Sequence, residues 1–344
     1  MKIIYLSRSH ADSIRMTKMH QLIEGKYKID SEGIYIPDNV NQNFGNTNLE
    51  WTRIDEGIFG VKSKWLFILI SKFHNFFLLL FLFKSVDILF ADYSTLKGSP
   101  VYYKAMLKLQ KRAKVTYILP HGSGNVFHAM HLNINIPYIK NSWNIRVHEL
   151  ESNESMHDLV LGDPFFLHEE VKTDANKGFD IVVLESGSIS HYLGYEHVED
   201  MYNVICSLDN WQGNTVVYAG HPRNVRVGCP LDIIYGKTSD LIGKADVVIS
   251  DCFTSLLAEI HYNKKKSLIY CPPQVVGSYV ELLKDNGFNT FRDILELQSA
   301  LENLDLLGNN YNPKFSEYYN FRKDKFLIHF NQQIEKQNII ACFK

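Results

Sequence analysis

The sequence predicts an α/β protein with two doubly wound parallel sheets, one in each of two domains. Its 344 residues suit two domains at roughly 100–200 residues each. Short apolar runs rich in strand-forming residues alternate with longer helical patterns, which is typical of a parallel sheet covered by helices. After residues 163–177, which look like a loop, this alternation starts again with a first strand of its own. The restart predicts a second Rossmann-like domain.

The N-terminal domain, residues 1–165, is expected to contain several strands separated by helices. The predicted strands are the runs KIIYL, VDILFADY and KVTYILP, and a helical pattern covers residues 101–111. β-branched and aromatic residues dominate such runs in strands. The first run ends at Leu6, which is too short for the apolar region of a signal peptide, so we expect a protein that is not secreted.

Residues 65–83 form the most apolar segment of the chain and are nearly long enough to cross a bilayer. Lys72, His74 and Asn75 lie at its centre, where such side chains are costly in lipid, so we do not expect the segment to span a membrane. Two structures remain open for it. One is a helix buried between the layers of the N-terminal domain, and the other is a helix lying on a membrane face.

The second domain, residues 175–312, is expected to contain the strands FDIVVLES, NTVVYAG, ADVVIS and SLIYCP. Helices are expected at residues 198–208 and from about Thr254 onward. Residues 313–344 are assigned to a C-terminal helix, because apolar residues recur at helical spacing between Phe315 and Glu335. Packing back on the N-terminal domain is one arrangement open to this helix.

Composition and charge exclude several classes of protein. The chain is 45% hydrophobic and 22% charged, as folded proteins are. With 36 Lys and Arg against 38 Asp and Glu, its formal charge of −2 provides no basic field, so no nucleic-acid partner is expected. The five cysteines are widely spaced and include no CxxC pair, which indicates a reducing cytoplasm and no structural zinc site.

The fingerprints of common cofactor sites are missing from the sequence. Leu231 stands where a P-loop ending in residues 236–238 would need its first glycine. Gly122 and Gly124 lack the third glycine of the dinucleotide fingerprint, and neither GxSxG nor HExxH occurs. No DxD pair stands at a strand end to hold a metal on a nucleotide. We therefore expect neither a bound cofactor nor a metal.

Polar residues gather instead at the predicted carboxyl ends of strands, where open α/β sheets bind ligands. In the N-terminal domain, His121 emerges where the strand KVTYI ends, within the sequence ILPHGSGN. Gly122 and Gly124 let the backbone bend close to a ligand. A loop histidine beside turn glycines would give the same pattern, so both interpretations stay open here.

Two polar groups in the second domain together predict an anion site. His221 and Arg223 follow the strand NTVVYAG. The strand ADVVIS ends at Ser250, and Thr254 and Ser255 are expected to cap the next helix. Free helix N–H groups, hydroxyls and the two basic side chains would satisfy a phosphate. Simple helix capping is the structural alternative.

Two acidic residues extend this predicted site. Glu259 lies one turn beyond Ser255 on the same helix face, where it could accept hydrogen bonds from a ribose or simply be solvated. Glu185 follows the strand FDIVVL and is expected to line the pocket for the base or the acceptor.

The order of these elements resembles that of GT-B transferases that use cytidine nucleotides. In the bacterial CDP-glycerol glycerophosphotransferases, WHG-type, G-x-P, HP and SDYSS elements follow one another, and here they read PHG, GDP, HP and SDCFTS. The bacterial sialyltransferases similarly combine an acidic element ending in Gly with HP and a Ser pair. The likeness covers residues 115–270, with Pro120 in place of Trp and Cys-Phe-Thr-Ser in place of Tyr-Ser-Ser.

This resemblance implies two Rossmann-like domains with a cleft between them and an enzyme of bacterial surface-glycan synthesis. It implies transfer of a glycosyl or glycerophosphoryl group from a CMP- or CDP-linked donor to a hydroxyl of a glycan or lipid-linked glycan. The expected location is the cytoplasm, including the inner face of the membrane. A sugar-nucleotide 2-epimerase of the same fold is the first alternative, and an inactive membrane-associated scaffold is the second.

The reaction assigns a role to each candidate residue. A base must remove the acceptor proton, a task for His121 with Glu185 as the next candidate. The leaving phosphate needs donors that are already in place, which would remove the need for a metal. The residues expected to bind the donor are Gly122, His221, Arg223, Ser250, Thr254, Ser255 and Glu259.

Overall fold

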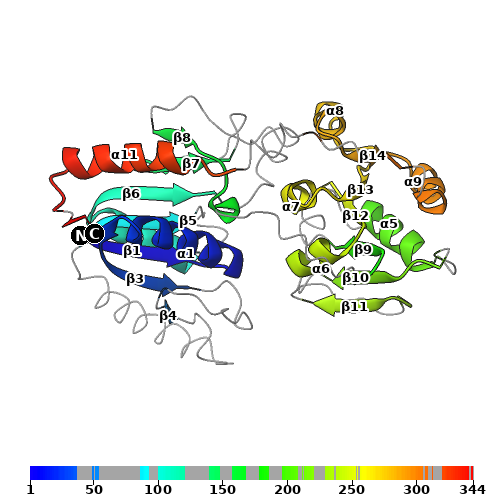
Figure 1. Cartoon of the computed structure of the whole chain (residues 1–344), viewed down its shortest axis with the longest axis horizontal. Coiled ribbons are helices and arrows are strands. Elements are labelled where there is room, and N and C mark those ends of the chain that lie inside the picture. The colour runs from blue at the N-terminus through cyan, green and yellow to red at the C-terminus, as the bar shows by residue number, and fades with distance from the viewer. Residues whose placement is uncertain are drawn as a thin grey trace. The chain divides into compact units, whose positions relative to one another are not determined.

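The computed structural model contains two compact units (Figure 1). Unit 1 comprises residues 1–121, 137–167 and 320–344, and unit 2 comprises residues 122–136 and 168–319. The described residues are 1–36, 49, 51–53, 86–92, 100–120, 139–147, 157–167, 178–185, 196–207, 211, 213–220, 229–235, 238–252, 254, 256–304, 307–308, 312, 320–340 and 342–343.

The strands described in unit 1 form a seven-stranded parallel sheet in the order β4-β3-β1-β5-β6-β7-β8. They are β1 (Lys2–Ser7), β3 (Asp30–Tyr35), β4 (Trp51–Arg53), β5 (Val86–Asp92), β6 (Ala113–Leu119), β7 (Trp143–Arg146) and β8 (Asp158–Val160). The three runs predicted in this domain are β1, β5 and β6. A short antiparallel pair, β2 (Tyr27–Lys28) with β15 (Cys342–Phe343), joins distant parts of the chain.

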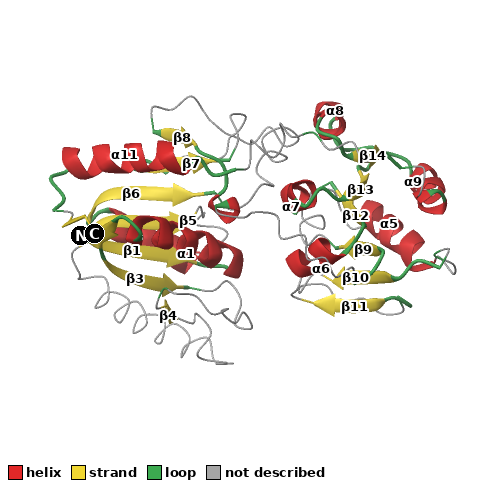
Figure 2. Ribbon diagram, in the orientation of Figure 1, coloured by secondary structure: helices red, strands yellow, loops and turns green. Residues whose placement is uncertain are grey.

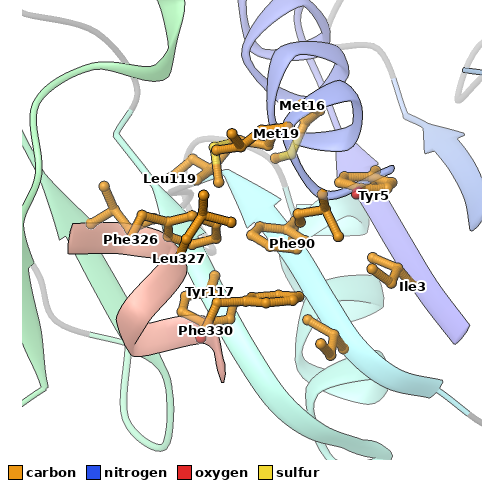
Figure 3. Packing of buried hydrophobic residues seen from close by; sticks show 14 of the residues in the cluster. Ile3, Tyr5, Met16, Met19, Phe90, Tyr117, Leu119, Phe326, Leu327 and Phe330 are labelled. Atoms are coloured by element: carbon orange, nitrogen blue, oxygen red, sulfur yellow. The ribbon is translucent and has the colours of Figure 1, made fainter. Parts of the chain in front are cut away.

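Helices cover both faces of this sheet (Figure 2). They are α1 (His10–Glu24), α3 (Pro100–Gln110) and α11 (Lys323–Lys336), with a short 3-10 turn, η2 (Pro164–Phe166). Side chains of α1 and α11 pack on one face, and those of α3 pack on the other. On the first face Phe90 and Tyr117 stack with centroids 5.1 Å apart, and Phe326 and Phe330 of α11 pack on them (Figure 3).

The C-terminal helix is shorter than the sequence pattern predicts, because α11 begins at Lys323 and not at Phe315. The backbone before it is attached to the end of β8: the Arg322 amide donates to the Leu161 carbonyl at 2.7 Å, and its guanidinium donates to the Val160 carbonyl at 3.1 Å. Phe321 is buried beside them. These contacts hold residues 321–322 outside the helix.

The strands described in unit 2 form a six-stranded parallel sheet in the order β11-β10-β9-β12-β13-β14. They are β9 (Ile181–Leu184), β10 (Val216–Gly220), β11 (Asp232–Tyr235), β12 (Val247–Asp251), β13 (Lys266–Tyr270) and β14 (Asn289–Phe291). The helices are α5 (Glu196–Ser207), α6 (Thr238–Lys244), α7 (Leu257–Tyr262), α8 (Gly277–Asp285) and α9 (Ile294–Glu302). The four predicted strands are β9, β10, β12 and β13. The fold class, two doubly wound α/β units, is therefore confirmed.

One pair of cysteines corrects the expectation of reduced thiols. Cys206, in the last turn of α5, forms a disulfide with Cys229, which lies shortly before β11, and their Cα atoms are 5.1 Å apart. The two are 23 residues apart in sequence, so spacing alone does not reveal that the fold brings them together. Cys252 and Cys271 are free and buried.

The apolar segment 65–83 lies outside the described residues, and its two interpretations stay open. Within the described part of the chain, we find no helix that is both long enough and apolar enough to cross a membrane.

Candidate functional site

Both sheets have a topological switch point, where the strand order reverses direction. In unit 1 it lies between β1 and β5, and in unit 2 between β9 and β12. Ligands of open α/β sheets bind outside the carboxyl ends of the strands at such points. The polar side chains at these two places are therefore the candidates for function.

At the switch point of unit 1, an arginine and an aspartate from neighbouring strand ends meet. Arg8 follows β1, and its Nε donates to Asp92 Oδ2, at the end of β5, over 3.2 Å. The Asp92 side chain is fully buried, whereas the Arg8 side chain is 12% exposed. The hydroxyl of Tyr102 accepts from the Asp92 amide and donates to the Leu6 carbonyl, both at 2.8 Å. Tyr102 thus ties the ends of β1 and β5 together.

The first turn of α1 adds further charged groups beside this pair. Ser9 caps the helix by accepting from the Asp12 amide at 3.2 Å, and its hydroxyl donates to the Asp12 carboxylate. One turn later, Arg15 donates two hydrogen bonds to Asp163, at 2.7 and 2.8 Å. Arg15 Nη1 also lies 3.5 Å from Asp12 Oδ1. The GDP element, which the resemblance linked to a family motif, here supplies Asp163 to a buried ion pair.

Burial and neighbouring charges shift the pKa values of these groups. Burial is the largest cause that raises the pKa of Asp92 well above its usual range, and Asp12 raises it further, while Arg8 opposes the shift. Burial alone would lower the pKa of Arg15, but the charge and hydrogen bonds of Asp163 outweigh it, so this pKa is raised. The cluster therefore combines the positive charges of two arginines with a carboxyl group whose pKa is raised.

The switch point of unit 2 is built mainly from strand ends and a tyrosine. Glu185 directly follows β9 and is buried, with its amide donating to the Ala219 carbonyl at 3.0 Å. The hydroxyl of Tyr202 lies 2.9 Å from the Leu184 carbonyl and 3.0 Å from Asp251 Oδ2. Ser250 is fully buried, and its hydroxyl makes a long contact of 3.5 Å with the same carbonyl of Leu184.

The segment after β12 differs from the predicted helix start. Helix α7 begins at Leu257, and no side chain caps it. Thr254 accepts instead from the Leu256 amide at 3.2 Å, so it stabilises the turn before the helix. Thr254 therefore does not cap helix α7 as the sequence predicts. Ser255 lies outside the described residues, and the anion site stays a prediction. Glu259 is 8% exposed within α7, so the solvated alternative does not hold for it.

The predicted site residues divide into two groups. Glu185, Ser250, Thr254 and Glu259 are described and lie at or near the carboxyl end of the unit 2 sheet. The other predicted residues lie outside the described part of the chain: His121, Gly122, His221, Arg223 and Ser255. Their roles stay predictions.

The charged cluster of unit 1 was not predicted from the sequence, although a signal for it is present. Arg8 follows one apolar run that is predicted as a strand, and Asp92 lies at the end of another. His121 was selected because it lies at the carboxyl end of a predicted strand, and the same reasoning applies to Arg8 and Asp92. Asp12 and Arg15 lie in the polar stretch SRSHADSIR. No sequence pattern indicates that these charges are buried, because charged residues are mostly exposed in folded proteins.

No protein-family model and no curated protein sequence matches this chain significantly. Several solved structures share its fold. One is a putative UDP-N-acetylglucosamine 2-epimerase from Listeria monocytogenes, with TM-score 0.56, 11% identity, and coverage of 98% of this chain and 97% of that chain. A second is the S. aureus MnaA–UDP co-structure, with TM-score 0.62, 10% identity, and the same coverage of 98% and 97%.

A third is the spinosyn rhamnosyltransferase SpnG complexed with thymidine diphosphate, with TM-score 0.54, 10% identity, and coverage of 96% of this chain and all of that chain (100%). At such low identity the likeness establishes the fold, and it extends over nearly the whole length of each protein. The chain therefore has the GT-B fold, shared by glycosyltransferases and 2-epimerases, with one Rossmann-like sheet in each unit.

Proposed function

We propose that this protein is an enzyme that transfers a glycosyl or glycerophosphoryl group from a nucleotide-linked donor to a hydroxyl of a bacterial surface glycan. One observation carries the proposal: each unit gathers polar groups at the switch point of its sheet. Arg8, Asp12 and Asp92 lie there in unit 1, and Glu185 and Ser250 lie there in unit 2. Two such places suit a reaction between two bound substrates.

The two halves of the reaction need different groups. A base is needed to take the proton of the acceptor hydroxyl, and the sequence assigns this role to His121, which follows β6. The leaving nucleotide phosphate needs hydrogen-bond donors, for which His221, Arg223, Thr254 and Ser255 are the candidates. These donors replace the charge that a metal would supply, so we expect turnover to persist in a chelator.

The donor is proposed to carry cytidine, on the strength of the HP and SDCFTS elements. Two of the solved structures that share the fold were determined with UDP and with thymidine diphosphate. The identity of the nucleobase in the donor is therefore the feature to test. We would measure the thermal stability of the full-length protein with CMP, CDP, UMP, UDP, TDP and GDP, because a bound ligand stabilises the folded state by mass action. Cytidine nucleotides should give the largest shift. Equal or larger stabilisation by UDP would remove the cytidine assignment.

The acceptor places the enzyme at the inner face of the membrane, where lipid-linked glycans are built. We expect part of the protein to sediment with vesicles of anionic phospholipid and to be released by high salt. Failure to sediment at low salt would return the apolar segment 65–83 to the core of the N-terminal domain.

A 2-epimerase is the second candidate, and the acid–base groups of unit 1 favour it, since an epimerase must remove and return a proton on the sugar. The assay is incubation with UDP-N-acetylglucosamine in D₂O. Deuterium at C2 of the sugar, without any acceptor present, would support epimerisation. Nucleotide release that requires a glycan acceptor would support transfer.

A further inference from the structure

The disulfide of unit 2 fastens the end of a helix to the start of an edge strand. Cys206 lies in the last turn of α5, and Cys229 lies just before β11, which begins at Asp232. Among the described strands, β11 pairs with β10 alone and forms one edge of the sheet (Figure 1). Its four side chains are half-buried or exposed. Burial therefore holds this strand only weakly, and the disulfide adds a covalent attachment to α5.

Helix α5 also reaches the switch point of unit 2. Tyr202 lies one turn before Cys206 on the same face of the helix. Its buried hydroxyl lies 2.9 Å from the Leu184 carbonyl and 3.0 Å from Asp251 Oδ2, at the ends of β9 and β12. Its ring packs edge-on against Tyr218 of β10, with centroids 5.8 Å apart. A single turn of α5 therefore connects the disulfide to the switch point.

The two bonded cysteines are more exposed than the free cysteines of the same sheet. Cys206 and Cys229 are half-buried, whereas Cys252 and Cys271, whose thiols are free, are fully buried. Exchange of a disulfide requires that a thiolate reach one of its sulfur atoms, and the partial exposure of both residues permits this. In a reducing cytoplasm, a disulfide is usually transient and serves catalysis or redox sensing.

We propose that the bond between Cys206 and Cys229 is a redox switch on nucleotide binding by unit 2. When the bond is closed, it holds the end of α5 in place, and Tyr202 ties β9 to β12 at the switch point. When the bond is open, α5 separates from the sheet more often, and the switch point loses this tie. The loosening of α5 stands on the contacts of unit 2, whereas its effect on nucleotide binding rests on the function proposed above.

The switch opens by thiol–disulfide exchange with a small thiol such as glutathione. A thiolate of the small thiol attacks one cysteine sulfur, and the S–S bond breaks with its electron pair on the other cysteine. A second thiolate then attacks the mixed disulfide and releases the first cysteine. Two small thiols are oxidised to one disulfide, the protein disulfide is reduced to two thiols, and the two protons of the small thiols end on the two cysteines. The reverse reaction closes the bond.

The size of the effect follows from thermodynamic linkage. Coupling between two sites typically changes an affinity by about 5–150-fold, and we expect nucleotide to bind more weakly to the reduced protein by a factor in this range. Linkage is reciprocal, so saturating nucleotide must shift the dithiol–disulfide equilibrium constant toward the closed bond by the same factor. A factor of ten corresponds to about 30 mV in the midpoint potential of this two-electron couple.

Binding of CMP and of UDP to the full-length protein tests the proposal in two glutathione buffers. One buffer is as reducing as a cytoplasm, and the other is oxidising. Titration calorimetry gives the affinity, and alkylation of free thiols followed by mass spectrometry gives the fraction of closed bond. We expect an open bond and weak binding in the reducing buffer, and a closed bond and tighter binding in the oxidising buffer. A bond that stays closed in both buffers would overturn the proposal, as would equal affinity in the two states.

Variants separate the switch from a general loss of stability. The double variant Cys206→Ser/Cys229→Ser should bind nucleotide weakly in both buffers. The control Cys342→Ser removes a cysteine from unit 1 and should keep the redox dependence. Tyr202→Phe keeps the ring but removes the hydroxyl, so it should weaken binding in the oxidising buffer and reduce the difference between the buffers. A redox effect of full size in Tyr202→Phe would contradict the connection through α5.

Amide exchange without nucleotide separates failure of this inference from failure of the proposed function. Reduction should raise the opening equilibrium constant of the last turn of α5 by up to about 100-fold. If α5 loosens but no nucleotide binds in either buffer, the loosening stands, while the proposed function and its regulation fail. If nucleotide binds equally well in both buffers and exchange in α5 is unchanged, the switch is wrong, although the proposed function stands.

Discussion

The ion pair between Arg15 and Asp163 offers the sharpest prediction about stability. Both hydrogen bonds are short, at 2.7 and 2.8 Å, and the two side chains are 8% and 1% exposed. In Arg15→Met the charge of Asp163 would remain buried without its partner, and Asp12 would lose its contact with the guanidinium. Removing one partner of a buried pair costs about 3–5 kcal/mol. We expect a loss of this size in unit 1.

The double variant Arg15→Met/Asp163→Asn should cost less than the sum of the two single variants. With both charges gone no buried charge is left unpaired, and the Asn side chain can still accept from the Phe165 amide, as Asp163 does at 2.9 Å. Residues in direct contact show coupling free energies of about 0.5–3 kcal/mol, and we expect a value near the upper end of this range. The matched control is Lys114→Met, because Lys114 pairs with Asp87 at 3.0 Å but is 46% exposed. It should cost at most about 1 kcal/mol.

The measurement should report on unit 1 alone, because a chain of two units does not unfold in a single step. Amide hydrogen exchange in α1 and η2 of the full-length protein gives the opening free energy at the pair itself. Additive costs in the double variant, or a loss in Arg15→Met no larger than in Lys114→Met, would refute the assignment of a tightly coupled buried pair.

Three further predictions follow from described contacts. Tyr102→Phe removes a hydroxyl that makes hydrogen bonds of 2.8 Å to both strand ends. It should destabilise unit 1 by about 1–3 kcal/mol, as measured by amide exchange. The control Tyr103→Phe, on the same helix, should be nearly neutral. Burial lowers the pKa of His329 to about 4, so an NMR titration should find its imidazole neutral at pH 7. The contribution of neutral His329 to stability is present above about pH 6.5 and is lost as pH falls toward 4. Reduction of the disulfide between Cys206 and Cys229, which are 23 residues apart, should lower the stability of unit 2 by about 3 kcal/mol; no change on adding reductant would show that the bond does not form in solution.

The central strands of both sheets could be predicted from the sequence because they are buried on both faces. Such strands appear as continuous apolar runs, as FDIVVL does for β9. The strand DSEGIY, β3, was not predicted, since its first half is polar and only its last three residues are buried. Helix α1 was missed for a related reason: it buries Ser13, Thr17 and His20 together with its apolar residues, so no clear apolar stripe marks its buried face.

The candidate site could be predicted only in part. Strand ends point to Glu185 and Ser250, and the structure places both at a switch point. The start of α7 could not be located, because a Thr-Ser pair suits both a helix cap and a turn before a helix. Arg15 and Asp163 are 148 residues apart in the sequence, and only the fold brings them together. Single-sequence patterns carry no information on such distant pairs.

The two switch points share a buried tyrosine hydroxyl, but they differ in whether that hydroxyl contacts the carboxylate at the strand end. In each unit a buried tyrosine hydroxyl spans the two central strands: Tyr102 bonds to the Leu6 carbonyl and the Asp92 amide, and Tyr202 contacts the Leu184 carbonyl and the Asp251 carboxylate. In unit 2 the tyrosine contacts the strand-end carboxylate itself. In unit 1 it holds only the backbone of Asp92, and the carboxyl group of Asp92 accepts a hydrogen bond from Arg8 instead. A buried carboxyl group whose backbone is fixed needs little rearrangement before it moves a proton. We therefore place the acid–base half of the proposed reaction in unit 1.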